Sequence, residues 1–201
     1  SEMCIRDSSS NKMKLKHGMM ISSIAWMWAG IVGGVVISLA TGTDFLNGIF
    51  ESTSALTGTG ITMFDNVEIL PHSILFFRAF EQWVGGLGVV VMVIGVLTRP
   101  GTATAKLYQS ESREERLKPS VKTTLKKTIE IYLIYTLAGI ILYLLAGMPT
   151  FDSICNTFCM IATGGMSIKN ANIGYYHNDL IYLISIVLMI LGATSFLAHY
   201  K

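Results

Sequence analysis

Residues 55–63 read ALTGTGITM, and this stretch decides how the fold is interpreted. It contains two glycines and three threonines, carries no charge, and lies between Glu51 and Asp65. A glycine-rich polar stretch of this kind is normally a surface turn. Here long apolar runs flank it on both sides, and such runs are typical of segments that cross a membrane. An ordinary surface turn is therefore not the obvious explanation.

The composition favours a membrane protein. Of 201 residues, 51% are hydrophobic and 14% are charged, whereas soluble domains carry about 25% charged residues. A membrane-spanning helix needs about 20 mostly apolar residues. Four segments qualify: residues 18–43, 72–97, 131–151 and 180–198. The segment 72–97 contains Arg78 and Glu81, so its first half has to face protein or water.

The distribution of charge predicts the topology. Lysine and arginine gather before the first segment and between the second and third, whereas the other two connections are acidic. By the positive-inside rule, the N-terminus and the central loop are cytoplasmic in a multi-pass cell-membrane protein. The acidic connections, which include Glu51, then face outward and would concentrate cations at an outer mouth.

The two outward connections share one organisation. Each begins with a short amphipathic stretch, continues with a glycine-rich turn (TGTGIT, then TGGMS), and ends in a polar link. The turns lie about 105 residues apart, from Gly60 to Gly165. This internal repeat predicts an all-α transmembrane fold of two span–pore helix–span repeats with re-entrant selectivity-filter loops. The expected divisions are a non-native or disordered stretch 1–14, a first repeat 15–98, a cytoplasmic loop 99–127 and a second repeat 128–201.

Irregular backbone at membrane depth is tolerated only where it lines a cavity or is buried in protein. A short helix followed by a glycine-rich strand satisfies this condition in ion channels, where the strand offers carbonyl oxygens to a dehydrated cation. The helix also directs its negative C-terminal end toward that cation. The alternative is an extracellular helical hairpin in a protein that transports nothing. One such loop favours the hairpin, but two in equivalent places favour a pore.

Three segments resemble the Trk/Ktr/HKT superfamily of potassium and sodium transporters, of the TrkH and KtrB type. They are FESTSALTGTGIT (50–62), ILFFRAFEQWVGGLGVVVMVIGVL (74–97) and FDSICNTFCMIATGGMSIKNANIGYY (151–176). Family members arrange four such repeats around one path, so the resemblance implies a fragment with the first two repeats. It implies potassium transport through a filter made of Thr57, Gly58, Thr59, Gly60, Ala162, Thr163, Gly164 and Gly165.

The resemblance also implies the ligands of the transported ion. Potassium would bind the backbone carbonyls of Thr57, Thr59, Gly60, Thr163 and Gly164, with no covalent cofactor. Glycine at Gly60 and Gly165 favours potassium in this family, and a sodium-permeable member of the superfamily is the alternative.

A pore-supporting network is expected from Arg78, Glu81 and Gln82. A buried arginine needs a partner, and Glu81 lies on the same helix face at i+3. The alternative for Arg78 is an interfacial side chain that extends outward to water. Gln82 is expected to form hydrogen bonds inside the helix bundle.

The resemblance also implies the partners of the chain. They are membrane lipid, the missing third and fourth repeats, a second copy forming a homodimer, and a cytosolic nucleotide-binding regulatory subunit (TrkA/KtrA-like). The last of these would dock on residues 106–127. Nothing in the sequence indicates a nucleic-acid partner. We find no nucleophile–base pair, metal cluster or phosphate loop, so the sequence does not predict an enzyme.

Overall fold

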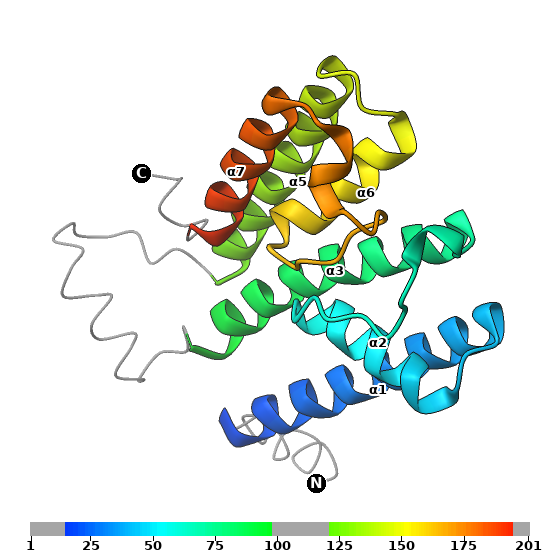
Figure 1. Cartoon of the computed structure of the whole chain (residues 1–201). Coiled ribbons are helices and arrows are strands. Elements are labelled where there is room, and N and C mark those ends of the chain that lie inside the picture. The colour runs from blue at the N-terminus through cyan, green and yellow to red at the C-terminus, as the bar shows by residue number, and fades with distance from the viewer. Residues whose placement is uncertain (1–14, 98–120, 195–201) are drawn as a thin grey trace, which may run out of the picture.

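The computed structural model of the chain describes residues 15–97 and 121–194, with side chains described within 19–88 and 125–194. These ranges contain helices and no strand (Figure 1). The helices are α1 (Leu15–Thr41), α2 (Phe45–Thr57), η1 (Val67–Ile69), α3 (His72–Leu97), α5 (Val121–Leu145), α6 (Thr150–Ile161), η2 (Asn172–Tyr176) and α7 (Asp179–Ala193).

Three predictions lie wholly or partly outside the described residues. They are the non-native stretch 1–14, the cytoplasmic loop with its docking surface up to residue 120, and the end of the last span from residue 195.

Within the described ranges, two long helices meet the requirements for crossing a membrane by length and composition. They are Met19–Thr41 and Leu125–Leu145, each with a mean hydropathy of 1.9. The apolar helix α7 is shorter within the described residues. Large apolar side chains such as Leu39 and Leu145 are mostly exposed on these helices, as expected for surfaces that face lipid or other protein.

The third predicted span differs in its boundaries. Helix α5 begins at Val121 and ends at Leu145, whereas the uncharged segment runs from residue 131 to 151. The chain turns at Gly147, which has a φ of +88°, and α6 begins directly after Pro149. Hydropathy alone does not detect this break, because the turn residues are themselves uncharged.

The short helices α2 and α6 pack against the long helices that precede them. In α2, the Asp44 side chain caps the first turn by accepting a hydrogen bond from the Leu46 amide at 3.0 Å. A Cβ atom at Gly34 of α1 would lie 2.6 Å from the Ile49 Cα atom. Only glycine therefore allows α1 and α2 to approach this closely.

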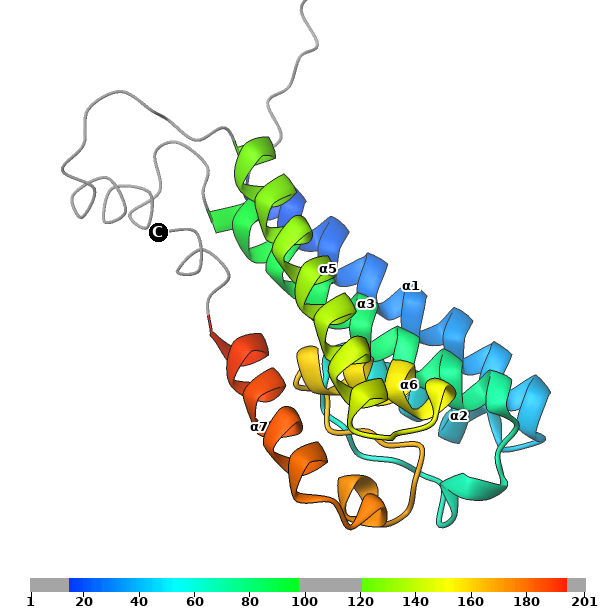
Figure 2. The ribbon, with the colours of Figure 1, turned by 90° about the horizontal axis from the view of Figure 1, so that it is seen from above.

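Helix α3 lies between the α1–α2 pair and the group formed by α5, α6 and α7 (Figure 1). Seen from above, the axes of α1, α3 and α5 are roughly parallel, and the chain runs along α3 in the direction opposite to α1 and α5 (Figure 2). One apolar core cluster joins the two halves of the chain. It consists of Val67, Leu70, Ile74, Leu75, Ala79, Cys155, Cys159 and Ile168. The turns that follow α2 and α6 are thus held on one shared scaffold.

Candidate functional site

The first glycine turn begins where α2 ends. The Gly58 amide donates to the Ala55 carbonyl at 3.2 Å, and the Thr59 amide donates to the Ser54 carbonyl at 3.0 Å. Gly58 and Gly60 have φ values of +69° and +77°. Paired bonds of this type close the C-terminus of a helix, and glycine adopts the left-handed conformation they require without steric cost.

The second turn, after α6, repeats these bonds 105 residues further on. The Thr163 amide donates to the Met160 carbonyl and the Gly164 amide to the Cys159 carbonyl, both at 3.0 Å. Gly165 has a φ of +82°, close to that of Gly60. Thr163 has a φ of +51° at the position that corresponds to Gly58, although a β-branched residue is strained there.

The two turns meet at their glycines. A Cβ atom at Gly60 would lie 3.0 Å from the Gly165 Cα atom and would collide with the Gly164 carbonyl oxygen. Glycine is therefore required at position 60 twice, for its positive φ and for the approach of the second turn. A cavity of about 230 Å³ lies at this junction and is lined by residues of both turns, among them Gly60, Thr62, Gly165 and Ser167.

Several turn carbonyls are available to a ligand. Within the described ranges, no hydrogen-bond donor reaches the carbonyls of Thr57, Thr59, Gly60 or Thr163. The Gly164 carbonyl accepts a hydrogen bond from Gln82 Nε2 at 2.7 Å. Helices α2 and α6 both end at the turns, so the negative ends of their dipoles lie beside these oxygens.

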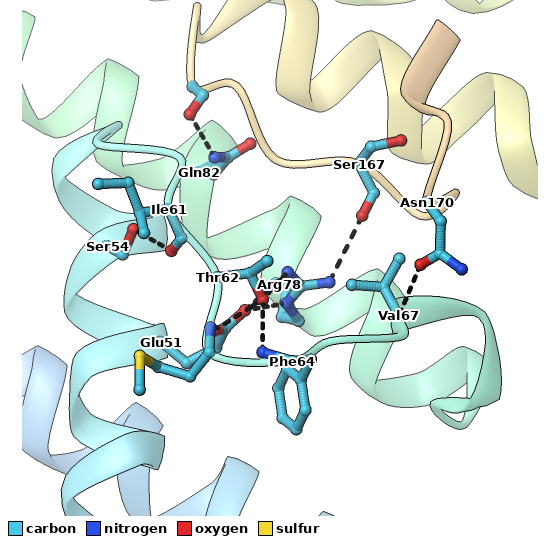
Figure 3. A network of polar contacts seen from close by, with 12 residues as sticks. Glu51, Ser54, Ile61, Thr62, Phe64, Val67, Arg78, Gln82, Ser167 and Asn170 are labelled. Carbon is cyan, nitrogen blue, oxygen red and sulfur yellow. Dashed lines mark hydrogen bonds and ion pairs between the residues drawn. The ribbon is translucent and has the colours of Figure 1, made fainter. Parts of the chain in front are cut away.

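A buried ion pair supports the first turn (Figure 3). Arg78 on α3 is 2% exposed and Glu51 on α2 is fully buried; Arg78 Nη2 lies 2.6 Å from Glu51 Oε1, and Arg78 Nε donates to the same oxygen at 2.7 Å. Glu51 also accepts hydrogen bonds from the Thr62 hydroxyl and the Met63 amide, each at 2.8 Å. The ion pair thus holds the strand that leaves the first turn.

The predicted pairing of Arg78 with Glu81 is wrong. Glu81 instead accepts a hydrogen bond from the Ser52 hydroxyl at 2.6 Å, and its second carboxylate oxygen has no partner among the described residues. Because Arg78 is buried, it does not extend to water either. Spacing along one helix could not identify the true partner, because Glu51 comes from a different helix.

Glu51 is a residue whose role the sequence interpretation missed. It is fully buried, so it is not one of the outer acidic residues that could concentrate cations. A lone carboxylate on a short, mostly apolar helix was the available indication, because such a group has to be paired when buried.

A second set of contacts joins the two polar links outside the turns. The Asn170 side chain accepts from the Val67 amide at 2.9 Å and donates to Asn66 Oδ1 at 2.8 Å. The backbone amide of Asn170 donates to Glu68 Oε1 at 3.1 Å. We call Asn66, Val67, Glu68 and Asn170 the outer clasp, since they tie together links from both halves of the chain.

The described residues offer no group of three or more His, Cys, Asp or Glu side chains that could hold a metal ion. Cys155 and Cys159 are free thiols in the shared core. Of the polar groups described at this site, the backbone oxygens of the turns are the ones suited to a monovalent cation.

Comparison with known proteins shows the class of membrane transport protein to which this helical fold belongs. Residues 4–201 match the TrkH family of cation transport proteins. The chain belongs to this family.

Individual relatives support the same assignment. An uncharacterised cation transporter of Methanocaldococcus jannaschii is 41% identical over 98% of this chain. The Trk system potassium uptake protein TrkH of Vibrio parahaemolyticus is 34% identical over 94% of it. The crystal structure of the potassium transporter TrkH from that organism superposes with a TM-score of 0.79 at 30% identity, covering 97% of this chain and 39% of that one.

The chain spans about two fifths of the length of these relatives, 41% and 40% of the two proteins respectively. These relatives are named as transporters, which agrees with the prediction that the chain is not an enzyme. The all-helical fold is likewise shared with the TrkH structure.

Proposed function

We propose that the chain forms two of the ion-conducting loops of a potassium uptake protein. In this proposal α2 and α6 are pore helices, and residues 57–60 and 162–165 are strands of a selectivity filter. The observation that carries it is the meeting of the two turns, which share their helix-ending bonds and their positive φ values at a spacing of 105 residues. The potassium uptake activity of the named relatives supports it further.

The proposed mechanism requires no covalent chemistry. A potassium ion loses water as it enters the filter, and carbonyl oxygens of Thr57, Thr59, Gly60, Thr163 and Gly164 take the place of that water. The negative ends of α2 and α6 stabilise the ion. Because Glu51 of the ion pair and Gln82 form hydrogen bonds with the segments of the two turns, the turns are held in shape while ions pass.

Two strands cannot surround an ion, so further strands have to complete the ring. We propose that they come from additional repeats, since the relatives are more than twice as long as this chain. A homodimer, a cytoplasmic N-terminus and a cytosolic nucleotide-binding regulatory subunit that docks on residues 106–127 belong to the same proposal.

The test replaces Gly60 and Gly165 by serine, separately, in the complete protein that contains this chain. Uptake of potassium is measured in cells that lack other potassium uptake, with sodium as competitor. We expect each variant to lose discrimination between the two ions by about tenfold or more, equivalent to about 1.4 kcal/mol.

Gly174→Ser is the matched control, because a Cβ atom at Gly174 meets no other atom within 4 Å. Unchanged uptake and discrimination in both filter variants would refute the filter assignment and leave a non-transporting pair of helical hairpins as the better explanation.

A further inference from the structure

Gln82 links α3 to the second turn. Its side chain is 1% exposed, and Nε2 donates to the carbonyl of Gly164, 82 positions further along the chain, at 2.7 Å (Figure 3). Since a carbonyl oxygen only accepts, the amide nitrogen has to face it. The other amide atom, Oε1, has no partner among the described residues, so in that part of the chain the amide bonds to the second turn alone.

The contact is also tightly packed. A Cβ atom at Gly164 would lie 2.5 Å from Gln82 Cδ, so the flat amide rests directly against the Gly164 backbone. The Gly164 carbonyl oxygen also lies so close to Gly60 that a Cβ atom there would collide with it. The Gly164 oxygen is thus in contact with both the Gln82 amide and the first turn.

The two turns are supported differently. The first is bound mainly from its own helix, where Glu51 and Ser54 of α2 bind Thr62, Met63 and the Ile61 carbonyl. Arg78 of α3 adds one hydrogen bond, from Nη2 to the Thr62 hydroxyl at 3.2 Å.

The residues that correspond to Glu51 and Ser54 in α6, 105 positions on, do not act this way. Asn156 Nδ2 donates to the Tyr176 hydroxyl at 3.1 Å and to the Asp152 carbonyl at 2.9 Å. The other counterpart is Cys159, a core thiol. In the described part of the chain, neither side chain bonds to the second turn.

Helix α3 supplies the missing support. Besides the Gln82 bond, Arg78 Nη1 donates to the Ser167 carbonyl at 3.5 Å. Both donors come from the first half of the chain and reach the segment after α6. The position of the second turn is therefore set across the boundary between the halves.

We propose that Gln82 is a positioning residue that sets the separation of the two filter strands, and through it the ion preference of the filter. This inference rests on the proposed function. The Gly164 carbonyl has two lone pairs, so it can accept from Gln82 and still face an ion. Without the Gln82 bond, the second strand moves relative to Gly60. The distance between the carbonyl oxygens of the two filter strands then changes.

The experiment uses the complete protein in cells that lack other potassium uptake, and compares uptake of potassium, rubidium and caesium. Gln82→Met keeps the length of the side chain but removes the donor, and Gln82→Asn keeps the amide but shortens its reach. We expect both variants to change the preference for potassium over caesium by about fivefold, the effect of about one hydrogen bond. The ratio of the uptake rates of two ions does not depend on how much protein reaches the membrane.

Thr136→Val is the matched control. It removes the acceptor of the Trp83 Nε1 bond between α3 and α5, which is 3.0 Å long, and that bond does not involve either turn. We expect it to lower uptake of all three ions in proportion. A Gln82 variant that inserts in the membrane but transports too slowly is tested as purified protein, by the difference in thermal stabilisation that potassium and caesium salts produce.

An unchanged ion preference in both Gln82 variants, with Gly60→Ser still altering discrimination, would refute the role of Gln82 and leave the filter intact. If Gly60→Ser and Gly165→Ser also change nothing, the proposed function itself fails.

Discussion

The Arg78–Glu51 pair places two opposite charges among apolar helices with almost no access to water. A buried pair of this kind adds little stability compared with two apolar residues, but loss of one partner leaves an uncompensated charge. Loss of Glu51 would also free the Thr62–Met63 strand, because Glu51 binds that strand directly. The pair therefore couples the stability of the chain to the shape of the first turn.

We predict that Arg78→Ala lowers the free energy of unfolding by about 3–5 kcal/mol, measured as a lower thermal midpoint of the purified complete protein. The double variant Arg78→Met, Glu51→Leu should be less destabilised than Arg78→Ala, since neither charge remains. A double variant as unstable as the single one would show that the charge pairing is not what matters.

Thr163 is a strained position whose side chain is not required for the backbone shape, since Gly58 adopts the same conformation in the first turn. A left-handed φ costs an L-residue about 1–2 kcal/mol that glycine does not incur. We predict that Thr163→Gly raises the free energy of unfolding by about 1 kcal/mol, seen as a higher thermal midpoint. Thr57→Gly, at the helical end of α2, is the control and should lower it.

For single residues, part of the site could be predicted from the sequence. The polar residues on α3 were expected to be buried because charge within an apolar segment has to be satisfied, and Arg78, Glu81 and Gln82 are indeed buried. Their partners were not predictable, because Glu51, Ser52 and Gly164 lie on other elements. A pattern on one helix carries no information on which neighbour faces it.

Among the elements, α2 and α6 share a second feature besides their turns. A Cβ atom at Gly85 of α3 would collide with the Leu56 carbonyl, and one at Gly192 of α7 would collide with the Ile161 carbonyl. Leu56 and Ile161 lie 105 residues apart, at the ends of α2 and α6. In each half, a glycine on the next helix therefore allows that helix to approach a carbonyl at the end of the short helix.

We predict that Gly85→Ala and Gly192→Ala each displace the end of the short helix and destabilise the protein by about 1–3 kcal/mol, as overpacking usually does. Both should also reduce potassium uptake in the complete protein. Gly174→Ala, in open space, should change neither property. Wild-type stability in the first two variants would contradict the close contact at these helix ends.

The helical turn η2 is tied to α6 by Tyr176. Its hydroxyl donates to Asp152 Oδ2 at 2.7 Å, and burial together with this bond raises the pKa of Tyr176 above its ordinary value of about 10. A raised pKa means that the folded state holds the proton more tightly. The resulting stabilisation is complete below about pH 10 and is lost as the pH rises further.

Accordingly, the thermal midpoint should not change through Tyr176 between pH 7 and pH 9, and should fall above about pH 10. Tyr176→Phe should be less stable than the parent at neutral pH and should lose less stability at alkaline pH. An equal alkaline decline in both proteins would assign it to other groups.

The elements themselves were largely predictable. Apolar segments of sufficient length indicated α1, α3, α5 and α7, and the bounds of α3 agree with the expected 72–97. The short helices were expected from amphipathic stretches between turn residues. The boundary between α5 and α6 was wrong because Gly147 and Pro149 interrupt an uncharged run without changing its hydropathy.

In the whole molecule, the halves are joined by the shared core, the α3 donors and the outer clasp. The clasp lies on the polar links, and Asn170 takes part in each of the hydrogen bonds that join one link to the other. None of these contacts between distant segments could be predicted from one sequence, since periodicity describes elements singly. They determine how the turns face one another.

We predict that Asn170→Ala weakens the link between the halves and lowers the free energy of unfolding by about 1–2 kcal/mol, because the Val67 amide loses its partner. Lys169→Ala is the control: this residue lies next to Asn170, and its ammonium packs over the Tyr175 ring outside the clasp. It should have a smaller effect on the thermal midpoint. An equal effect would mean that the clasp contributes nothing specific.

The support of the second turn by α3 bears on how the chain is made. A ribosome completes α3 before α6 emerges, so Arg78 and Gln82 are already present when the second turn forms. The first turn has two of its anchors, Glu51 and Ser54, in the helix just synthesised, and Arg78 joins them when α3 follows. The two halves end their short helices with the same bonds, but their order in the chain matters. If the second half were synthesised first, its turn would enter the membrane before Arg78 and Gln82, the donors that hold it.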